Sequence, residues 1–137
     1  MTVFVDTSAF YAAADRGDSS HGRAKALIDQ AEALVTSDHV LVETWFLLRS
    51  RGGRAAAELF WQGLRSGLAK VESVLSADLD LAWRIGEAFP DQDFSLVDRT
   101  SFALMQRLGV VTAISFDDDF AIYRFGRSRE RAFEVRR

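Results

Sequence analysis

The stretch SLVDRTSFALMQRLGVVTAISFDDDF, residues 95–120, decides the fold. It begins with Ser95 and Asp98 at the spacing of a capping box, continues with apolar residues at helical spacing, and reaches a helix-ending glycine at Gly109. Val110–Ile114 then has the composition of a short buried strand, and three aspartates follow it closely. The stretch therefore predicts a helix, a strand and an acidic strand end in succession.

The rest of the chain repeats this alternation of helix and strand. The expected strands are residues 3–5, 33–36, 70–73, 110–114 and 131–135. The expected helices are residues 8–14, from 19 or 20 to 31, 38–51, 54–65, 76–89 and 95–109, with a helical turn at 120–123. We expect Asp38 and Ser76 to cap two of these helices. Such an alternation predicts a parallel sheet covered on both faces, with ligands bound beyond the carboxyl ends of its strands.

Length and composition narrow the class of protein. A chain of 137 residues with 48% hydrophobic content can bury one core, so we expect one domain over residues 1–137. The absence of cysteine excludes disulfides, thiolate zinc sites and thiol nucleophiles. The first residues lack the pattern of a signal peptide, and no apolar run is long enough to span a bilayer. We therefore expect a cytoplasmic protein with no membrane partner.

The charge pattern points to local rather than global contact with nucleic acid. A net charge of −3 argues against a protein that coats nucleic acid through overall basicity. Residues 124–137, however, hold six arginines against two glutamates. We expect Arg124 and Arg127 to contact phosphates there, the alternative being a basic terminus that is merely solvated.

Four acidic residues stand in apolar surroundings, namely Asp6 in VFVDTSAF, Glu43 in VLVETWFLL, Asp98 in SLVDRTSFAL and Asp117 in AISFDDDF. Acidic side chains are rarely buried without a partner, and few cations lie near these in the sequence. Several carboxylates brought together either raise one another's pKa or hold a divalent cation. Oxygen ligands without cysteine favour Mg²⁺ or Mn²⁺ over zinc.

Each acid also has a purely structural interpretation. Asp6 could end a strand, Asp98 could only cap a helix, Glu43 could face solvent, and residues 117–119 could form a turn. Considered one at a time, the acids favour these structural interpretations. All four together at strand ends and first helical turns favour a shared site.

The four motifs resemble the PIN domain, and in particular the VapC-like toxins of bacterial toxin and antitoxin pairs. They are Asp6-Thr7-Ser8 after the first strand, Glu43 near the start of a helix, Ser95-Leu-Val-Asp98 opening a late helix, and Ser115-Phe-Asp117 after a strand. The resemblance covers nearly the whole chain. It implies an α/β/α sandwich with four to five short, mainly parallel strands. It also implies that Asp6, Glu43, Asp98 and Asp117 bind one or two Mg²⁺ or Mn²⁺ ions and catalyse endonucleolytic hydrolysis of RNA.

The resemblance carries further implications. Asp119 becomes a possible supplementary ligand beside Asp117, and Thr7 and Ser95 become polar companions that orient the carboxylates. The implied partners are a tRNA, rRNA or mRNA substrate, a VapB-like antitoxin and a second copy of the chain. Aromatic residues of the predicted helices could form an exposed groove for a protein partner, although packing in the core is their simpler role: Trp45, Phe46, Phe60 and Trp61.

Three other functions compete with a toxin nuclease. A receiver-type phosphoacceptor needs an acidic pair after its first strand and a lysine after a late strand, but Thr7 follows Asp6 and no lysine lies beyond Lys70. A PIN-like module that binds RNA or protein without catalysis is a second alternative. A nuclease of housekeeping RNA maturation is the third, and the sequence does not separate it from a toxin.

Overall fold

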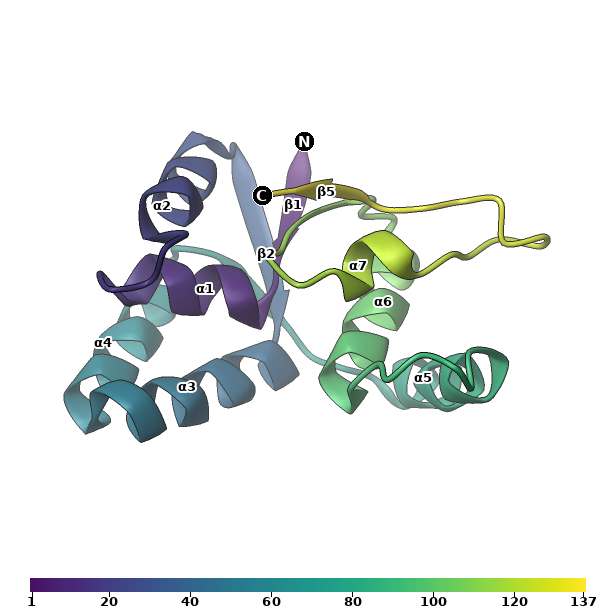
Figure 1. Cartoon of the computed structure of the whole chain (residues 1–137), viewed down its shortest axis with the longest axis horizontal. Helices are drawn as coiled ribbons and strands as arrows, with labels where there is room; N and C mark the ends of the chain where they lie inside the picture. Colours follow the sequence, from purple (N-terminus) through teal and green to yellow (C-terminus); the bar gives the residue numbers. More distant parts are fainter.

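The computed structural model describes residues 1–137 and contains a five-stranded sheet and seven helices (Figure 1). The strands are β1 (Thr2–Val5), β2 (Ala33–Ser37), β3 (Lys70–Glu72), β4 (Thr112–Ile114) and β5 (Glu134–Arg136). The helices are α1 (Thr7–Ala14), α2 (His21–Gln30), α3 (Asp38–Gly52), α4 (Arg54–Arg65), α5 (Ser76–Ala88), α6 (Leu96–Leu108) and α7 (Asp119–Ile122). All strand pairs are parallel, in the order β3-β2-β1-β4-β5.

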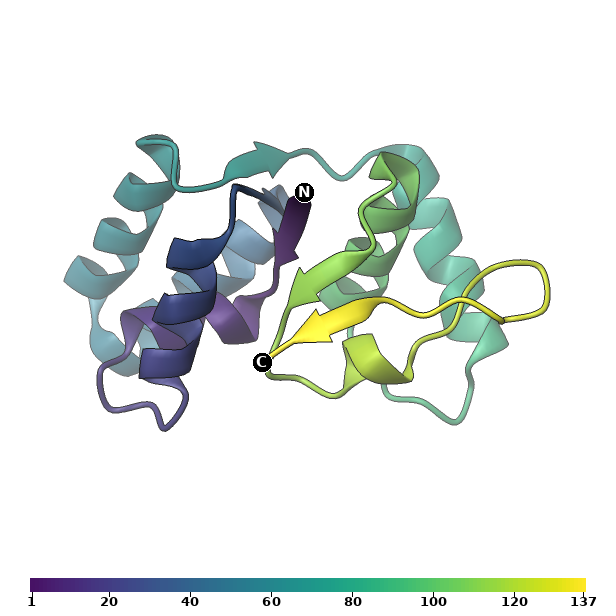
Figure 2. The ribbon, with the colours of Figure 1, turned by 90° about the horizontal axis from the view of Figure 1, so that it is seen from above.

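The helices form a layer on each side of the sheet. Helices α1 to α4 lie on one side of the strands and α5 to α7 on the other, and two views at right angles agree on this (Figures 1 and 2). The chain moves outward from β1 to β3, crosses back to β4 through α5 and α6, and then moves outward the other way to β5. Since parallel crossovers are right-handed, the two directions place their helices on opposite faces. The predicted α/β/α sandwich with a parallel sheet is confirmed.

The strand order reverses between β1 and β4, which are neighbours although more than a hundred residues separate them. Val5 pairs with Ile114 at the end of this contact, and the Asp6 backbone N–H donates to the Ile114 carbonyl at 3.1 Å. In open parallel sheets, ligands bind outside the carboxyl ends of strands at such a reversal. The fold thus places Asp6 and the loop after β4 where a site is expected.

Two predicted helix caps are wrong. The cap of α3 is Ser37, whose Oγ accepts from the Val40 N–H at 3.0 Å, whereas the Asp38 carboxylate accepts from the Val74 N–H at 3.0 Å. Helix α5 starts at Ser76 itself, one residue earlier than a Ser76 cap would require, because Leu75 is the cap and its N–H donates to the Asp78 carboxylate at 2.9 Å. In both cases a neighbouring side chain satisfies the end of the helix better than the expected one.

Stacked aromatic rings fix α6 against α7 and the last strand. Phe102 of α6 stacks on Tyr123 with ring centroids 4.4 Å apart and meets Phe120 of α7 edge-on at 4.9 Å. Phe133, which precedes β5, packs against the same Tyr123 ring. Such ring pairs add about 0.5–1.5 kcal/mol each beyond burial of their area. The cluster holds α6 against α7 and the residue that follows it.

No helix of this structure is both long and apolar enough to cross a membrane.

Candidate metal centre

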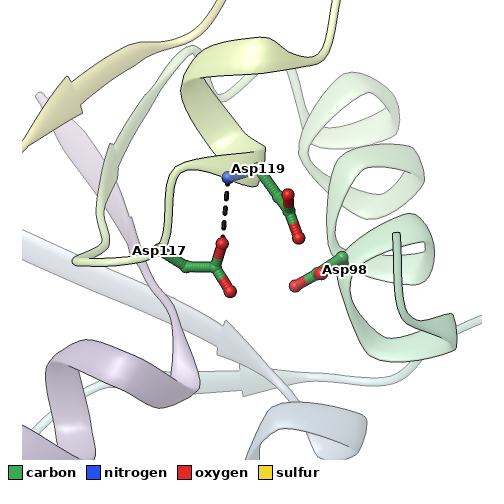
Figure 3. Close-up of side chains that lie close together, drawn as sticks. All are labelled: Asp98, Asp117 and Asp119. Atoms are coloured by element: carbon green, nitrogen blue, oxygen red, sulfur yellow. Dashed lines mark hydrogen bonds between the residues drawn. The ribbon is translucent and has the colours of Figure 1, made fainter. Parts of the chain in front are cut away.

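Three aspartates meet at the carboxyl end of the sheet. Asp98 comes from the first turn of α6, Asp119 begins α7, and Asp117 lies in the loop between β4 and α7. One carboxylate oxygen of each lies within 4.8 Å of the others, and the three side chains point toward one another (Figure 3). Divalent cations of the Mg²⁺ class accept oxygen ligands in this kind of arrangement. The three aspartates therefore form a group of carboxylates that could hold a divalent cation at the strand ends.

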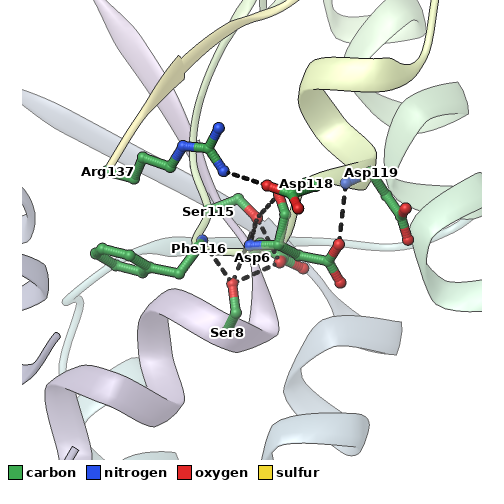
Figure 4. A network of polar contacts seen from close by, with 8 residues as sticks. Asp6, Ser8, Ser115, Phe116, Asp118, Asp119 and Arg137 are labelled. Atoms are coloured by element: carbon green, nitrogen blue, oxygen red, sulfur yellow. Dashed lines mark hydrogen bonds and ion pairs between the residues drawn. The ribbon is translucent and has the colours of Figure 1, made fainter. Parts of the chain in front are cut away.

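Asp6 lies beside this group and is held by two serine hydroxyls. Ser115 Oγ donates to Asp6 Oδ2 at 2.8 Å, and Ser8 Oγ donates to the same oxygen at 2.9 Å (Figure 4). Ser8 Oγ also accepts from the Phe116 backbone N–H at 2.9 Å, which ties α1 to the loop after β4. Two hydroxyls on one oxygen fix the orientation of the carboxylate and leave Asp6 Oδ1 without a side-chain donor.

Burial and mutual repulsion raise the pKa values of these acids. Burial raises the pKa of Asp6 to about 6, although its two serine partners oppose the shift. Burial, a hydrogen bond with Asp119 and the charges of Asp6 and Asp117 raise the pKa of Asp98 to about 8. Burial also raises the pKa of Asp119. No lysine or arginine forms an ion pair with Asp6, Asp98 or Asp119, so the group lacks a compensating cation of its own.

The loop that carries Asp117 is ordered by its own polar groups. Ser115 Oγ accepts from the Asp117 N–H at 3.1 Å, and Asp117 Oδ1 accepts from the Asp119 N–H at 2.9 Å (Figure 3). These bonds turn the chain so that the Asp117 and Asp119 side chains face Asp98, whereas Asp118 faces Arg137 (Figure 4). The loop thus brings both candidates for the fourth ligand to the centre.

The two predicted polar companions differ in their contacts. Ser95 Oγ accepts from the Asp98 N–H at 3.0 Å and the Ser95 N–H donates to Asp98 Oδ2 at 3.3 Å, a reciprocal capping box. The Thr7 hydroxyl is buried without a hydrogen-bond partner. Thr7 contacts the Asp6 carboxylate only through its backbone N–H, and this hydrogen bond lowers the pKa of Asp6. Ser8, one residue later, makes the side-chain contact that was expected of Thr7.

Glu43 lies on α3, partly buried, and is not among the three acids whose oxygens converge. It stands one turn after His39, whose Nδ1 lies 3.2 Å from Thr100 Oγ1 of α6. Since residues four apart share a helical face, Glu43 projects from the face of α3 that meets α6. Thr100 Oγ1 itself donates to the Val97 carbonyl at 3.1 Å, so His39 Nδ1 is the donor to Thr100.

The arginines of the basic segment have different surroundings. Arg124 Nη1 donates to backbone carbonyls at the end of α7, including that of Tyr123 at 3.0 Å. Arg127 is exposed. Arg137 Nη1 donates to Asp118 Oδ1 at 2.7 Å beside the acidic loop (Figure 4). Of these three, Arg137 is the one in contact with the residues around the candidate centre.

Comparison with known proteins assigns the family. The model of the PIN domain matches residues 3–126. The chain belongs to the PIN-domain family. The predicted membership is confirmed, and the match spans all four predicted acids, from Asp6 to Asp117.

Relatives within the PIN-domain family carry VapC names. The chain is 41% identical over 125 residues to the 23S rRNA-specific endonuclease VapC20 of Mycobacterium tuberculosis, covering 90% of this chain and 95% of that protein. The crystal structure of that VapC20, described as a Sarcin-Ricin loop cleaving toxin, matches with a TM-score of 0.83 over 88% of this chain and 93% of the other. Ribonuclease VapC26 of the same organism is 28% identical over 116 residues, 84% of this chain and 86% of that protein. The predicted resemblance to VapC toxins is confirmed.

A more distant structure shares the fold alone. VapBC2 from Rickettsia felis, solved bound to a DNA fragment from its promoter, matches at 10% identity with a TM-score of 0.67, over 89% of this chain and 92% of the other.

The residues present fit the divalent metal that PIN-domain nucleases use. The three converging side chains offer carboxylate oxygens only, and the pKa values of Asp98 and Asp119 are raised because no positive charge offsets their burial and repulsion. A cation of two charges removes that repulsion directly. The histidines make other contacts, since His21 Nδ1 lies 2.9 Å from the Ala12 carbonyl and His39 meets Thr100.

The sequence motifs contain the two serines that hold Asp6, but the sequence alone assigns them no role. Ser8 stands two residues after Asp6, and Ser115 stands two residues before Asp117, so each is next to a predicted acid. A hydroxyl that flanks an acid at a strand end is the signal that could have found them. The contact of Ser115 with Asp6 is not evident from the sequence, because it spans 109 residues and depends on the pairing of β1 with β4.

Proposed function

We propose that this chain is a divalent-metal-dependent endoribonuclease and the toxin of a VapBC-type pair, folded as a single PIN domain over residues 1–137. The observation that carries the proposal is the convergence of Asp98, Asp117 and Asp119 within 4.8 Å beside the buried Asp6, without a paired cation. The nuclease names of relatives that match most of the chain support the same activity.

In this proposal Asp6, Asp98 and Asp117 are the main ligands of Mg²⁺ or Mn²⁺, with Asp119 as a further ligand and Glu43 contributing from α3. When bound, such a cation lowers the pKa of water to give a nucleophile and stabilises charge on the phosphate. Asp98 has to lose the proton that its raised pKa retains near neutral pH before it can bind the cation. Metal binding should therefore release protons and strengthen as the pH rises.

The supporting residues hold the carboxylates in place. Ser8 and Ser115 fix Asp6 through its Oδ2, and Ser95 fixes Asp98 by the capping box of α6. Carboxylates whose orientation is set before the cation binds lose less entropy on binding it. We assign Ser8 and Ser115, together with Ser95, to positioning rather than to the chemistry itself.

We propose an rRNA hairpin as the substrate class. The relative at 41% identity is named as specific for 23S rRNA, and it aligns with 90% of this chain. Arg127 remains a candidate RNA contact because it is exposed, whereas Arg124 is engaged with backbone carbonyls of its own segment.

Cleavage of purified ribosomal RNA tests the proposal. The chain should cut 23S rRNA at a few positions with Mg²⁺ or Mn²⁺ and not with EDTA, and Asp98→Asn should abolish cutting. Asp80→Asn is the matched control, since Asp80 is an exposed aspartate of α5 outside the centre. Failure of the folded, metal-loaded chain to cut any RNA would favour a binding module, and maturation of a precursor RNA without damage to 23S rRNA would favour a housekeeping nuclease.

We also propose that exposed apolar side chains receive protein partners, a VapB-like antitoxin and a second copy of the chain. Phe46 of α3 is 60% exposed, and with Trp61 of α4 it lines a groove that also includes Leu41, Val42 and Trp45. Large exposed apolar patches mark interaction sites, although Phe60 of the same helix pair is buried in the core. Light scattering of the purified chain alone and after addition of the antitoxin, with Phe46→Glu as the variant, separates the two partners.

A further inference from the structure

Strand β5 brings the segment that follows it to the acidic loop. The N–H of Ser115, whose hydroxyl holds Asp6, donates to the Arg136 carbonyl at 3.2 Å. The next side chain, Arg137, donates from Nη1 to Asp118 Oδ1 at 2.7 Å (Figure 4). The Arg137 carbonyl accepts from Arg23 Nε at 3.2 Å, which anchors the backbone to α2. The backbone of Arg137 is therefore anchored, and its side chain points toward the acidic loop.

Most of the Arg137 guanidinium remains available for a ligand. A guanidinium has five N–H donors in a planar fork, and the bond to Asp118 is the one side-chain hydrogen bond that Arg137 donates. Its side chain is 44% exposed. An exposed ion pair contributes little to stability, so stabilising the fold does not by itself explain the pairing.

Other arginines of the basic segment are engaged elsewhere. Arg129 and Arg131 lie over the rings of Phe89 and Phe125, and Arg136 pairs with Glu134. Arg137 instead pairs with the aspartate that stands between Asp117 and Asp119. A polyanionic substrate that approaches the centre meets many negative charges, and a cation at their edge reduces that repulsion.

We propose that Arg137 binds a backbone phosphate of the RNA next to the one that is cut, with Asp118 orienting its guanidinium. The inference rests on the proposed nuclease function and assigns one contact of its substrate. Arginine suits this role because its fork binds two oxygens of a phosphate at once. The contact positions the RNA and carries no sequence preference of its own.

Binding of a fluorescent RNA stem-loop with the sarcin–ricin sequence, in EDTA to prevent cleavage, tests this assignment by anisotropy. Arg137→Gln should weaken binding about tenfold and lower the slope of log affinity against log salt by about one. Arg137→Lys should recover part of the loss because it keeps the charge. Asp118→Asn should weaken binding less than Arg137→Gln does, since the guanidinium stays and a negative charge is removed while its orienting partner is lost. Arg54→Gln, which breaks the exposed pair of Arg54 with Glu58, is the matched control and should have no effect.

Two results would overturn the assignment. One is wild-type affinity in Arg137→Gln with an unchanged melting temperature. The other is an equal loss of affinity in Arg137→Gln and Asp118→Asn with no change in salt slope. That result would mean that Arg137 only stabilises the acidic loop and does not contact the RNA. Cleavage by the wild-type chain in Mg²⁺ is measured separately, so a chain that binds through Arg137 but never cuts refutes the nuclease and not this contact.

Discussion

Two buried aspartates occupy the same local position and differ in everything around them. Asp78 and Asp98 are each the third residue of a helix, α5 and α6, and each accepts a hydrogen bond from the backbone N–H of the residue that precedes its helix. Their exposed fractions are 2% and 8%. By sequence pattern and backbone geometry alone, the two side chains are nearly equivalent.

Their charged neighbours make one structural and the other a candidate ligand. Arg107 Nε lies 3.0 Å from Asp78 Oδ1, whereas Asp98 faces Asp119 and Asp117. Burial by itself would raise the pKa of Asp78, but the hydrogen bonds from Arg107 and the Leu75 N–H outweigh it and the pKa is lowered. For Asp98, burial and neighbouring acids act in the same direction and the pKa rises to about 8. A buried acid without a cation is thus the better marker of a functional site.

Removal of the charge should abolish most activity at Asp98 and leave it nearly unchanged at Asp78, and this is the largest difference that we expect. Asp98→Asn should lower the rate of RNA cleavage by about a thousandfold, because a ligand of the proposed cation is lost. Asp78→Asn should leave the rate of the folded protein within about threefold of wild type, since Asp78 contacts no part of the centre. Single-turnover cleavage of 23S rRNA measures both. Equal losses in the two variants would remove the functional distinction between the helices.

Arg107→Met should leave the buried Asp78 carboxylate without a paired cation, as Asp98 is in the wild-type chain. A buried carboxylate left without its cation destabilises the fold by about 3 kcal/mol, and the pKa of Asp78 should then rise. Urea unfolding at neutral pH measures the free energy change, with Arg54→Met in the exposed Arg54–Glu58 pair as control. A loss as small as that of the control would show that the Asp78 pair adds nothing.

Asp6 offers an intermediate case, because hydroxyls rather than a cation hold it. Ser115→Ala should weaken Mn²⁺ binding by about ten- to a hundredfold and raise the pKa of Asp6 further, since a donor to its ionised form is lost. Ser8→Ala should act in the same direction. Calorimetric titration with Mn²⁺ measures the affinity, with the exposed Ser128→Ala as control. Unchanged affinity in both serine variants would mean that Asp6 is positioned by the backbone alone.

The smallest expected effect is a dependence of stability on pH. A carboxyl whose pKa is higher in the folded than in the unfolded chain binds more protons when folded, so stability falls as pH rises between the two values. For Asp98 that window runs from about 4 to about 8. The metal-free protein should melt several degrees lower at about pH 8 than at about pH 5. Asp98→Asn should flatten this profile of melting temperature against pH. A profile that stays equally steep would mean that groups other than Asp98 cause the pH dependence.

The sequence predicted the elements of the fold and the acids that local patterns mark. Asp6 stood out at a strand end, Asp98 in a capping box and Asp117 after a buried strand, and the structure brings all three to one end of the sheet. Helix α4 has the predicted bounds, whereas β5 starts at Glu134 rather than Arg131 because an isolated bridge joins Phe125 to Arg131.

The rest depended on contacts between distant residues. Asp78 was not singled out, and its partner Arg107 is 29 residues away. The choice between Asp117 and Asp119 could not be made from spacing because hydrogen bonds within the loop turn both side chains toward Asp98. Glu43 was predicted from its place early in a helix, but its distance from the other acids depends on how α3 crosses α6. Local patterns therefore found acids, and tertiary pairing decided which of them act together.

The central place of β1 in the sheet has a consequence for synthesis on the ribosome. The first strand to leave the exit tunnel has to wait for β4, and Asp6 meets Ser115 only after 109 further residues have been added. Long-range parallel pairing of this kind is slow to form. A nascent or truncated chain that lacks β4 consequently cannot assemble the acidic centre, so the proposed nuclease activity would appear only once the sheet is complete.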